Sequence, residues 1–196
     1  MQHQWIAGQW HKPARDKIPV LDPATEAVLD HIPRGTAEDA DLAVTAARQA
    51  FEHWRWLPAL EKAQMLHRIA GDLRARQKEI ATLMTREGGK PFCENRDEVE
   101  WVAACFQYYA EIGRNSRGNS IPPTFHHQVN FTIKEPYGVV VGIIPWNYPL
   151  LLMVWKVAPA LMAGNTVILK PSNDTPLSLL KLAGIFGQHL PRSEEH

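Results

Sequence analysis

Asn147 is the residue best placed in this sequence to take part in catalysis. It follows an uncharged apolar run and lies between Pro145 and Pro149, which restrict the backbone on both sides. An amide N–H that is held in place can stabilise an oxyanion, and removing such a donor typically slows an enzyme by about 10²–10³. The alternative is an asparagine that simply tolerates a tight turn, and the spacing alone favours that alternative.

Lys170 and Ser172 are candidates for binding a ligand. They lie where an apolar run ends and a helix is expected to begin, and both side chains can hydrogen-bond the hydroxyls of a ribose. The alternatives are a lysine at a sheet edge and a serine that caps a helix. Asp174 or Thr175, together with Pro176, could form the start of that helix.

Lys156 interrupts the apolar helix expected over residues 149–162. An ammonium group on such a helix is costly unless it reaches water or a polar partner, so Lys156 must face a wet or polar place. A long side chain that reaches solvent explains this pattern as well as a functional role does.

One strand–helix–strand unit is expected to position these residues. Residues 139–144 are apolar at odd and even positions, as in a strand covered on both faces, and residues 166–169 form a second strand after the helix 149–162. The right-handed crossover rule places the two strands parallel in one sheet, where ligands gather beyond the carboxyl ends of the strands. Segments 145–147 and 170–173 are therefore expected to converge.

The preceding part of the chain is predicted to contain short strands and three helices. Short strands are expected within residues 5–10 and around residues 27–29, and Thr36 can cap the first long helix. A second helical run covers residues 59–87, after which two glycines stop it. A third helix is expected to have one apolar face, which contains Val99, Val102, Ala103, Phe106, Ala110 and Gly113. It is followed by a loop marked by Gly118.

The segment from Val129 to Ile133 is predicted to be a strand. Val129, Phe131 and Ile133 alternate with polar residues, which is the two-residue period of a strand with one buried and one exposed face.

Composition favours a packed soluble protein. Of the 196 residues, 45% are hydrophobic and 21% charged, and 21 basic residues balance 21 acidic ones. The chain therefore has no net charge that would attract nucleic acid or an anionic membrane. Cys93 and Cys105 match no metal-binding pattern and the start resembles no signal peptide, so a cytoplasmic protein without a metal is expected.

The residues from Tyr137 to Trp155 contain no charge, and a run of that length can indicate a membrane span. Pro145 and Pro149 divide it into a short β-branched block and a leucine-rich block. The run is therefore interpreted as strand, turn and helix, and no membrane association is expected.

Stretches spread over nearly the whole chain resemble one family. The most specific ones read EPYG at 135–138, IPWNYP at 144–149, WKVAPAL at 155–161 and GNTVILKPS at 164–172. Others lie upstream, in the same order as in the family: Trp5 to Trp10, Asp22 to Thr25, Phe51 to Trp54 and Glu87 to Pro91. Together they make the chain similar to the aldehyde dehydrogenase family.

This resemblance implies an α/β fold. Expected is the start of an aldehyde-dehydrogenase-type Rossmann-like cofactor domain, truncated, with an amino-terminal helical part and short strands. Residues 1–190 would be a partial NAD(P)-binding domain with an oligomerisation-type strand near 120–135. Residues 191–196 would be an off-pattern tail, and the catalytic domain would be absent.

The resemblance also implies roles for the candidate residues. The asparagine matching Asn147 helps form the oxyanion hole, and the lysine matching Lys156 belongs to a charge relay in some members. Backbone at Ile144, Pro145 and Trp146 would line the cofactor site. For Lys156 the implied role favours function over the alternative given above.

A second group of implied roles concerns the ribose of NAD or NADP. Lys170, Ser172 and Asn173 would hold this ribose. Many members carry a glutamate at the position of Asn173, where it repels a 2′-phosphate, and the neutral asparagine removes that repulsion. Both cofactors are therefore compatible with the sequence.

The family's nucleophilic cysteine and its general-base glutamate lie well downstream of the matched region. Neither Cys93 nor Cys105 occupies a matching position, so both are interpreted as structural thiols. The chain alone is expected to be inactive and to leave an apolar sheet edge exposed. The full-length protein would be a homo-oligomer that oxidises a small aldehyde to an acid. The alternative is a non-catalytic nucleotide-binding or oligomerisation module.

Overall fold

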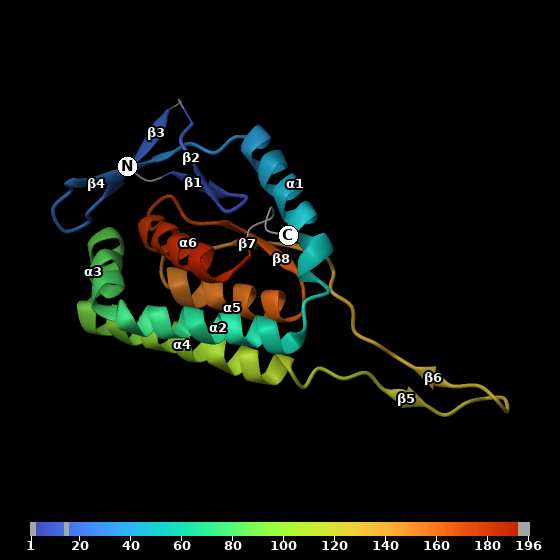
Figure 1. The fold of residues 1–196 in the computed structure, drawn as a ribbon. Coiled ribbons are helices and arrows are strands. Elements are labelled where there is room, and N and C mark those ends of the chain that lie inside the picture. The colour runs from blue at the N-terminus through green and yellow to red at the C-terminus, as the bar shows by residue number, and fades with distance from the viewer. Residues whose placement is uncertain (1–2, 14–15, 192–196) are drawn as a thin grey trace.

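The computed structural model describes residues 3–13 and 16–191, and two antiparallel hairpins open the chain (Figure 1). Strand β1 (Gln4–Ile6) pairs with β2 (Gln9–His11), and β3 (Lys17–Leu21) pairs with β4 (Val28–Pro33). The short strands predicted within residues 5–10 and around residues 27–29 are confirmed, and β3 is a strand that the sequence pattern did not indicate.

Helix α1 (Ala37–Trp54) begins where the sequence predicts. The Thr36 hydroxyl accepts a hydrogen bond from the Asp39 amide at 3.4 Å, and the Asp39 carboxylate accepts one from the Thr36 amide at 2.9 Å. This reciprocal arrangement is a capping box. At the other end of the helix, the Trp54 indole N–H donates to the carbonyl of Leu161 at 3.0 Å.

The helical run predicted over residues 59–87 is two helices, α2 (Ala59–Ala75) and α3 (Gln77–Gly88). The single-helix prediction is therefore wrong at Arg76, whose backbone has φ −107° and ψ 13°. No glycine or proline marks the break, and both helices contact α4 (Phe92–Gly113) and α6 (Leu177–His189). Gly89, with φ 72°, ends α3 as expected.

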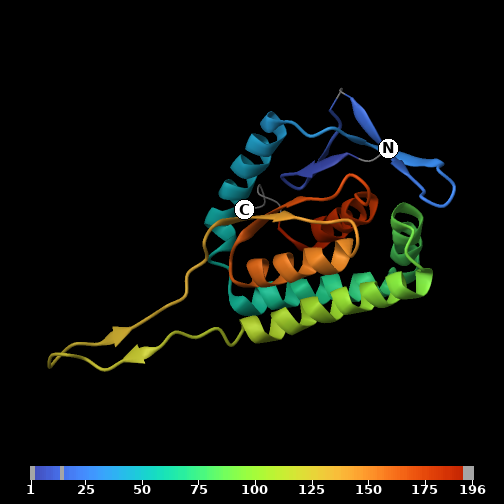
Figure 2. The same cartoon turned by 180° about the vertical axis from the view of Figure 1, so that it is seen from behind.

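The predicted strand from Val129 to Ile133 is reduced to a two-residue strand. Strand β6 (Asn130–Phe131) pairs only with β5 (Ser120–Ile121), in the segment expected to be a loop. The two strands form an arm that projects from the body of the molecule (Figures 1 and 2). The prediction that one face is buried is wrong, because Val129 is 83% exposed and Phe131 67% exposed. The arm has no packing surface within the described part of the chain.

The predicted strand–helix–strand unit is confirmed. Strand β7 (Val139–Ile143) leads through a turn into α5 (Pro149–Met162), and β8 (Thr166–Lys170) follows. The strands β7 and β8 are parallel and in register from Val139 opposite Thr166 to Ile143 opposite Lys170.

Strand β7 is covered on one face only, so the prediction of two covered faces is wrong. Gly142 is buried, whereas Val141 is 56% exposed and Ile143 68% exposed. Among the described residues β7 pairs with β8 alone, and two helices, α1 and α5, contact it. This exposure agrees with the expected apolar edge.

The main hydrophobic core lies between the helices. Helix α5 separates the β7–β8 pair from the layer formed by α2 and α4, and α6 packs beside α5 (Figures 1 and 2). The largest fully buried side chains of this core are Leu66, Ile69, Leu73, Ile80, Phe106, Ile144, Leu150, Met153, Leu182 and Ile185.

The uncharged run from Tyr137 to Trp155 is divided between β7, the following turn and the first half of α5. Across the described residues, no helix combines the length and the apolar character that a membrane span requires.

Candidate functional site

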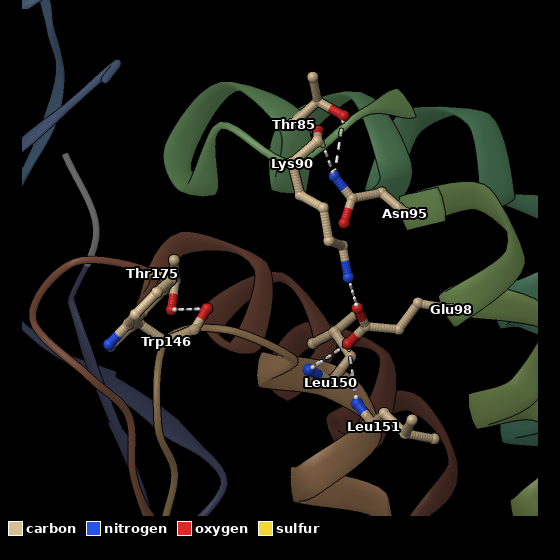
Figure 3. A network of polar contacts seen from close by, with 8 residues as sticks. All are labelled: Thr85, Lys90, Asn95, Glu98, Trp146, Leu150, Leu151 and Thr175. Carbon is tan, nitrogen blue, oxygen red and sulfur yellow. Dashed lines mark hydrogen bonds and ion pairs between the residues drawn. The ribbon is translucent and has the colours of Figure 1, made fainter. Parts of the chain in front are cut away.

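The turns that follow β7 and β8 meet at one edge of the sheet. The Ile144 amide donates to the carbonyl of Lys170 at 3.0 Å, which extends the parallel pairing one residue past β7. The Thr175 hydroxyl then donates to the carbonyl of Trp146 at 3.4 Å (Figure 3). The predicted convergence of segments 145–147 and 170–173 is therefore confirmed.

The turn after β7 exposes polar and aromatic side chains and is fixed to the core by one buried residue. Ile144 is 2% exposed and fixes the turn to the core, whereas Trp146 is 60% exposed and Pro145 and Asn147 are exposed as well. The side-chain amide of Asn147 is thus accessible to a ligand at the carboxyl end of β7. Its geometry is compatible with the predicted donor role, which stays a prediction.

The second turn presents an ammonium group and an amide. Lys170 is exposed, and its Nζ donates to the carbonyl of Pro171 at 2.9 Å, which leaves further N–H groups for a ligand. Asn173 is exposed as well. The Ser172 hydroxyl bonds the Asp174 carboxylate at 3.1 Å and accepts from the Asp174 amide at 3.3 Å. These accessible donors fit a ribose bearing hydroxyl groups.

The helix start predicted at Asp174 or Thr175 with Pro176 lies one or two residues before the observed N-cap. Helix α6 has Pro176 as its N-cap and Leu177 as its first residue, and no local side chain caps it. Ser172 and Asp174 instead close the turn that precedes the helix.

The Lys156 ammonium group reaches a polar environment, as predicted from the sequence. It is exposed on α5, and its Nζ donates to the carbonyl of Leu152 at 3.3 Å. Its stem crosses β7 at Gly142, where a Cβ would lie 3.5 Å from the Lys156 Cδ. The ammonium group therefore reaches solvent beside the strand that leads to Asn147.

Glu98 is a site residue that the sequence reasoning missed. It is fully buried on α4, and its Oε1 accepts from the amides of Leu150 and Leu151 at 3.1 and 3.0 Å (Figure 3). Its Oε2 forms a salt bridge with Lys90, whose Nζ also lies 3.7 Å from the centroid of the Tyr148 ring. Glu98 therefore caps α5, whose own N-cap residue makes no side-chain bond.

Glu87 plays the equivalent role for α6 and was missed as well. It is 3% exposed, and its two oxygens accept from the amides of Leu177 and Ser178 at 2.7 and 2.9 Å. Burial raises the pKa of Glu87 to about 7, although the bonds from the two amides favour the charged form. Both helices that follow a strand of the parallel pair thus begin on a buried glutamate.

A sequence signal for both glutamates exists. Asn95 and Glu98 continue the apolar stripe of α4 towards its start, four residues before Val99 and Val102, and Glu87 continues the stripe of α3 after Met84. A charged residue on a buried stripe needs a partner.

The two cysteines lie outside the two turns. Cys93 is exposed in the first turn of α4, and Cys105 is half-buried further along the same helix. Desolvation raises the pKa of the Cys105 thiol, which disfavours the nucleophilic thiolate.

Comparisons with known proteins identify relatives of the chain. The profile of the family described as "Aldehyde dehydrogenase family" matches residues 10–193. Aminoaldehyde dehydrogenase 2 of Zea mays is 45% identical over 190 residues, which are 92% of this chain and 38% of the relative. Aminoaldehyde dehydrogenase 1, peroxisomal, of Malus domestica is 42% identical over 190 residues, which are again 92% of this chain and 38% of the relative. The chain thus spans about two fifths of the length of these relatives.

Solved structures are similar over almost the whole chain. A betaine aldehyde dehydrogenase from Staphylococcus aureus in complex with NAD+ superimposes with a TM-score of 0.95 at 32% identity, covering 98% of this chain and 39% of that one. An E. coli enzyme described as NADP dependent superimposes with a TM-score of 0.95 at 34% identity, covering 98% and 40%.

Proposed function

Because this chain belongs to the aldehyde dehydrogenase family, we propose that it is the cofactor-binding part of an enzyme that oxidises a small aldehyde with NAD(P)+. The product of this reaction would be a carboxylic acid. The observation that carries the proposal is the meeting of the two turns after β7 and β8, which gathers the candidate residues at one sheet edge. Residues 1–190 would form this partial domain, and the tail predicted at 191–196 lies, except for its first residue, outside the described residues.

The residues at this edge divide between cofactor and substrate in the proposal. The Lys170 ammonium, Ser172 and Asn173 would hold the adenosine ribose, while the first turn, Ile144 to Trp146, would line the cofactor site. Asn147 would donate a hydrogen bond to the oxyanion of the reacting aldehyde. Lys156, which reaches solvent beside β7, would take part in proton movement.

The bound nicotinamide would supply the hydride acceptor. The nucleophile would come from a part of the enzyme outside this chain, since the two thiols of the chain lie away from both turns. The neutral Asn173 supports use of either NAD or NADP. The names of the relatives, which refer to aminoaldehydes and betaine aldehyde, support a small aldehyde as the substrate.

The β5–β6 arm supports a second part of the proposal, namely that the protein assembles with further subunits. The arm exposes apolar side chains without a packing partner in the described chain, and a strand edge of this kind can pair with another chain. These side chains are Ile121, Phe125, Val129, Phe131 and Ile133. If the chain binds no cofactor, assembly through the arm would be its remaining function.

We also propose a cytoplasmic location, which the unpaired cysteines support. The peroxisomal relative from Malus domestica makes the peroxisome the competing compartment. Fluorescence microscopy of the tagged full-length protein separates the two.

Calorimetric titration of the 196-residue chain with NAD+ and NADP+ tests cofactor binding. We expect Lys170→Ala to weaken binding about tenfold, the scale set by one hydrogen bond from a charged group. Lys134→Ala, which removes an exposed lysine near the arm, is the matched control and should bind as the wild type does. A folded chain that binds neither dinucleotide, or equal binding by both variants, would contradict the proposal. Reduction of cofactor by the chain alone with any aldehyde would contradict the external nucleophile.

A further inference from the structure

The start of α5 is held by groups that lie far away in the sequence. The first-turn amides of Leu150 and Leu151 find their acceptor in Glu98, which precedes Leu150 by 52 residues. Figure 3 shows the Glu98 side chain reaching from α4 towards these two amides. A serine or aspartate at position 148 could cap the helix locally. The chain instead has Tyr148 there, without a side-chain cap, and thereby couples the start of α5 to α4.

Lys90 extends this coupling to the residue next to Asn147. Its ammonium group pairs with Glu98 and stacks on the ring of Tyr148, which directly follows Asn147. Lys90 is itself fixed, because the Asn95 side chain donates to the Lys90 carbonyl at 3.0 Å and to the Thr85 hydroxyl at 2.9 Å. Both charged groups are therefore held in one geometry.

The other neighbour of Asn147 is held from the opposite side. The carbonyl of Trp146 accepts from the hydroxyl of Thr175, a residue that is 2% exposed. Asn147 itself is exposed and has no recorded side-chain hydrogen bond in the described structure. Its position is consequently set through the residues on either side of it.

We propose that Glu98, together with Lys90, is a positioning residue for the turn that carries Trp146 and Asn147. The inference rests on the proposed function, because it assigns the turn to the cofactor and oxyanion site. Glu98 is fully buried, so it acts through the amides of Leu150 and Leu151 and through the Lys90–Tyr148 contact. A carboxylate that only capped α5 would affect the amides of Leu150 and Leu151 when neutralised, and would leave the Asn147 side chain and the Kd for NAD+ unchanged.

The test compares Glu98→Gln with Glu100→Gln in the ¹⁵N-labelled 196-residue chain. Glutamine keeps the shape of Glu98 and removes its charge, whereas Glu100 lies on the same helix and pairs with Arg74 at the surface. In the Glu98 variant we expect displaced or broadened NMR signals for the backbone of 145–151 and for the Asn147 side-chain amide. We expect its Kd for NAD+ to rise about tenfold, the scale of one hydrogen bond. The Glu100 variant should change neither.

Hydrogen exchange of the wild-type chain provides a measurement that does not depend on a variant that folds. First-turn amides of a helix normally lack an acceptor and exchange readily, so slow exchange at Leu150 and Leu151 supports the capping contact through which Glu98 would position the turn. Rapid exchange there would overturn it, as would changes in the Glu98 variant confined to α4. Failure of the wild type to bind NAD+ would reject the proposed function alone, since the NMR and exchange results decide the positioning role.

Discussion

At both junctions between strand and helix, a buried glutamate caps the helix. The two junctions differ in whether that glutamate also has a cationic partner. At the β7–α5 junction, Glu98 accepts two helix amides and forms a salt bridge with Lys90. At the β8–α6 junction, Glu87 accepts two helix amides and has no recorded salt bridge within residues 3–13 and 16–191. The two junctions therefore differ in whether a cation pairs with the buried carboxylate. Desolvation raises the pKa of Glu87 to about 7.

Lys90→Met breaks this comparison and should have the largest effect. It converts the first junction into a copy of the second, because Glu98 keeps its two amides and loses its cation. Leaving one partner of a buried ion pair unpaired costs about 3–5 kcal/mol. We expect this loss in the free energy of unfolding, measured by urea denaturation. Lys78→Met, at an exposed position of α3, should cost less than about 0.5 kcal/mol.

Glu87→Gln tests the second junction through the pH dependence of the free energy of unfolding. The pKa of Glu87 is about 7 in the folded chain against an ordinary value of 4.5, so the folded chain binds more protons between these values. The stability contributed by Glu87 is therefore full below pH 4.5 and is lost as the pH rises through 7, by up to about 3 kcal/mol. Glutamine mimics the protonated form and should remove this decline. Urea denaturation between pH 4 and pH 8 measures it.

Glu94→Gln, at an exposed position of α4, is the control for this pH dependence. It should retain the wild-type decline in stability. Identical slopes for both variants would show that Glu87 is not the group responsible.

Thr175→Val is the mildest change and tests the link between the two junctions. It removes the hydroxyl that donates to the Trp146 carbonyl and keeps the side-chain volume. We expect a loss of about 1 kcal/mol in unfolding free energy, since the exposed Trp146 lets water replace part of the bond. Thr82→Val, which removes an exposed hydroxyl bond to the Lys78 carbonyl, should cost less. An equal loss in both variants would mean that the Thr175 bond does not join the junctions.

The features that the sequence predicted correctly depend on local patterns. The apolar runs and the prolines around Asn147 define β7, the turn and α5, and the handedness of the crossover then brings Lys170 to the same edge. The capping box of Thr36 is equally local. Each of these features can be derived from residues a few positions apart.

The features that escaped prediction depend on distant partners. Glu98 and Glu87 acquire their roles from amides 52 and 90 residues further along the chain, so their place on an apolar stripe indicates burial without identifying the partner. The break at Arg76 is marked by no glycine or proline, so the helical spacing of residues 59–87 carries no signal for it. The alternation of Val129 to Ile133 predicts a buried face, yet burial requires a surface that the described chain does not supply.

The two buried glutamates also determine where an anion can bind. A helix N-terminus usually attracts a phosphate, because its free N–H groups and its dipole favour negative charge. At α5 and α6 the amides of Leu150, Leu151, Leu177 and Ser178 are already engaged by carboxylates. A diphosphate approaching either helix would find these donors already occupied. Groups other than the first-turn amides of these two helices must therefore bind the phosphates.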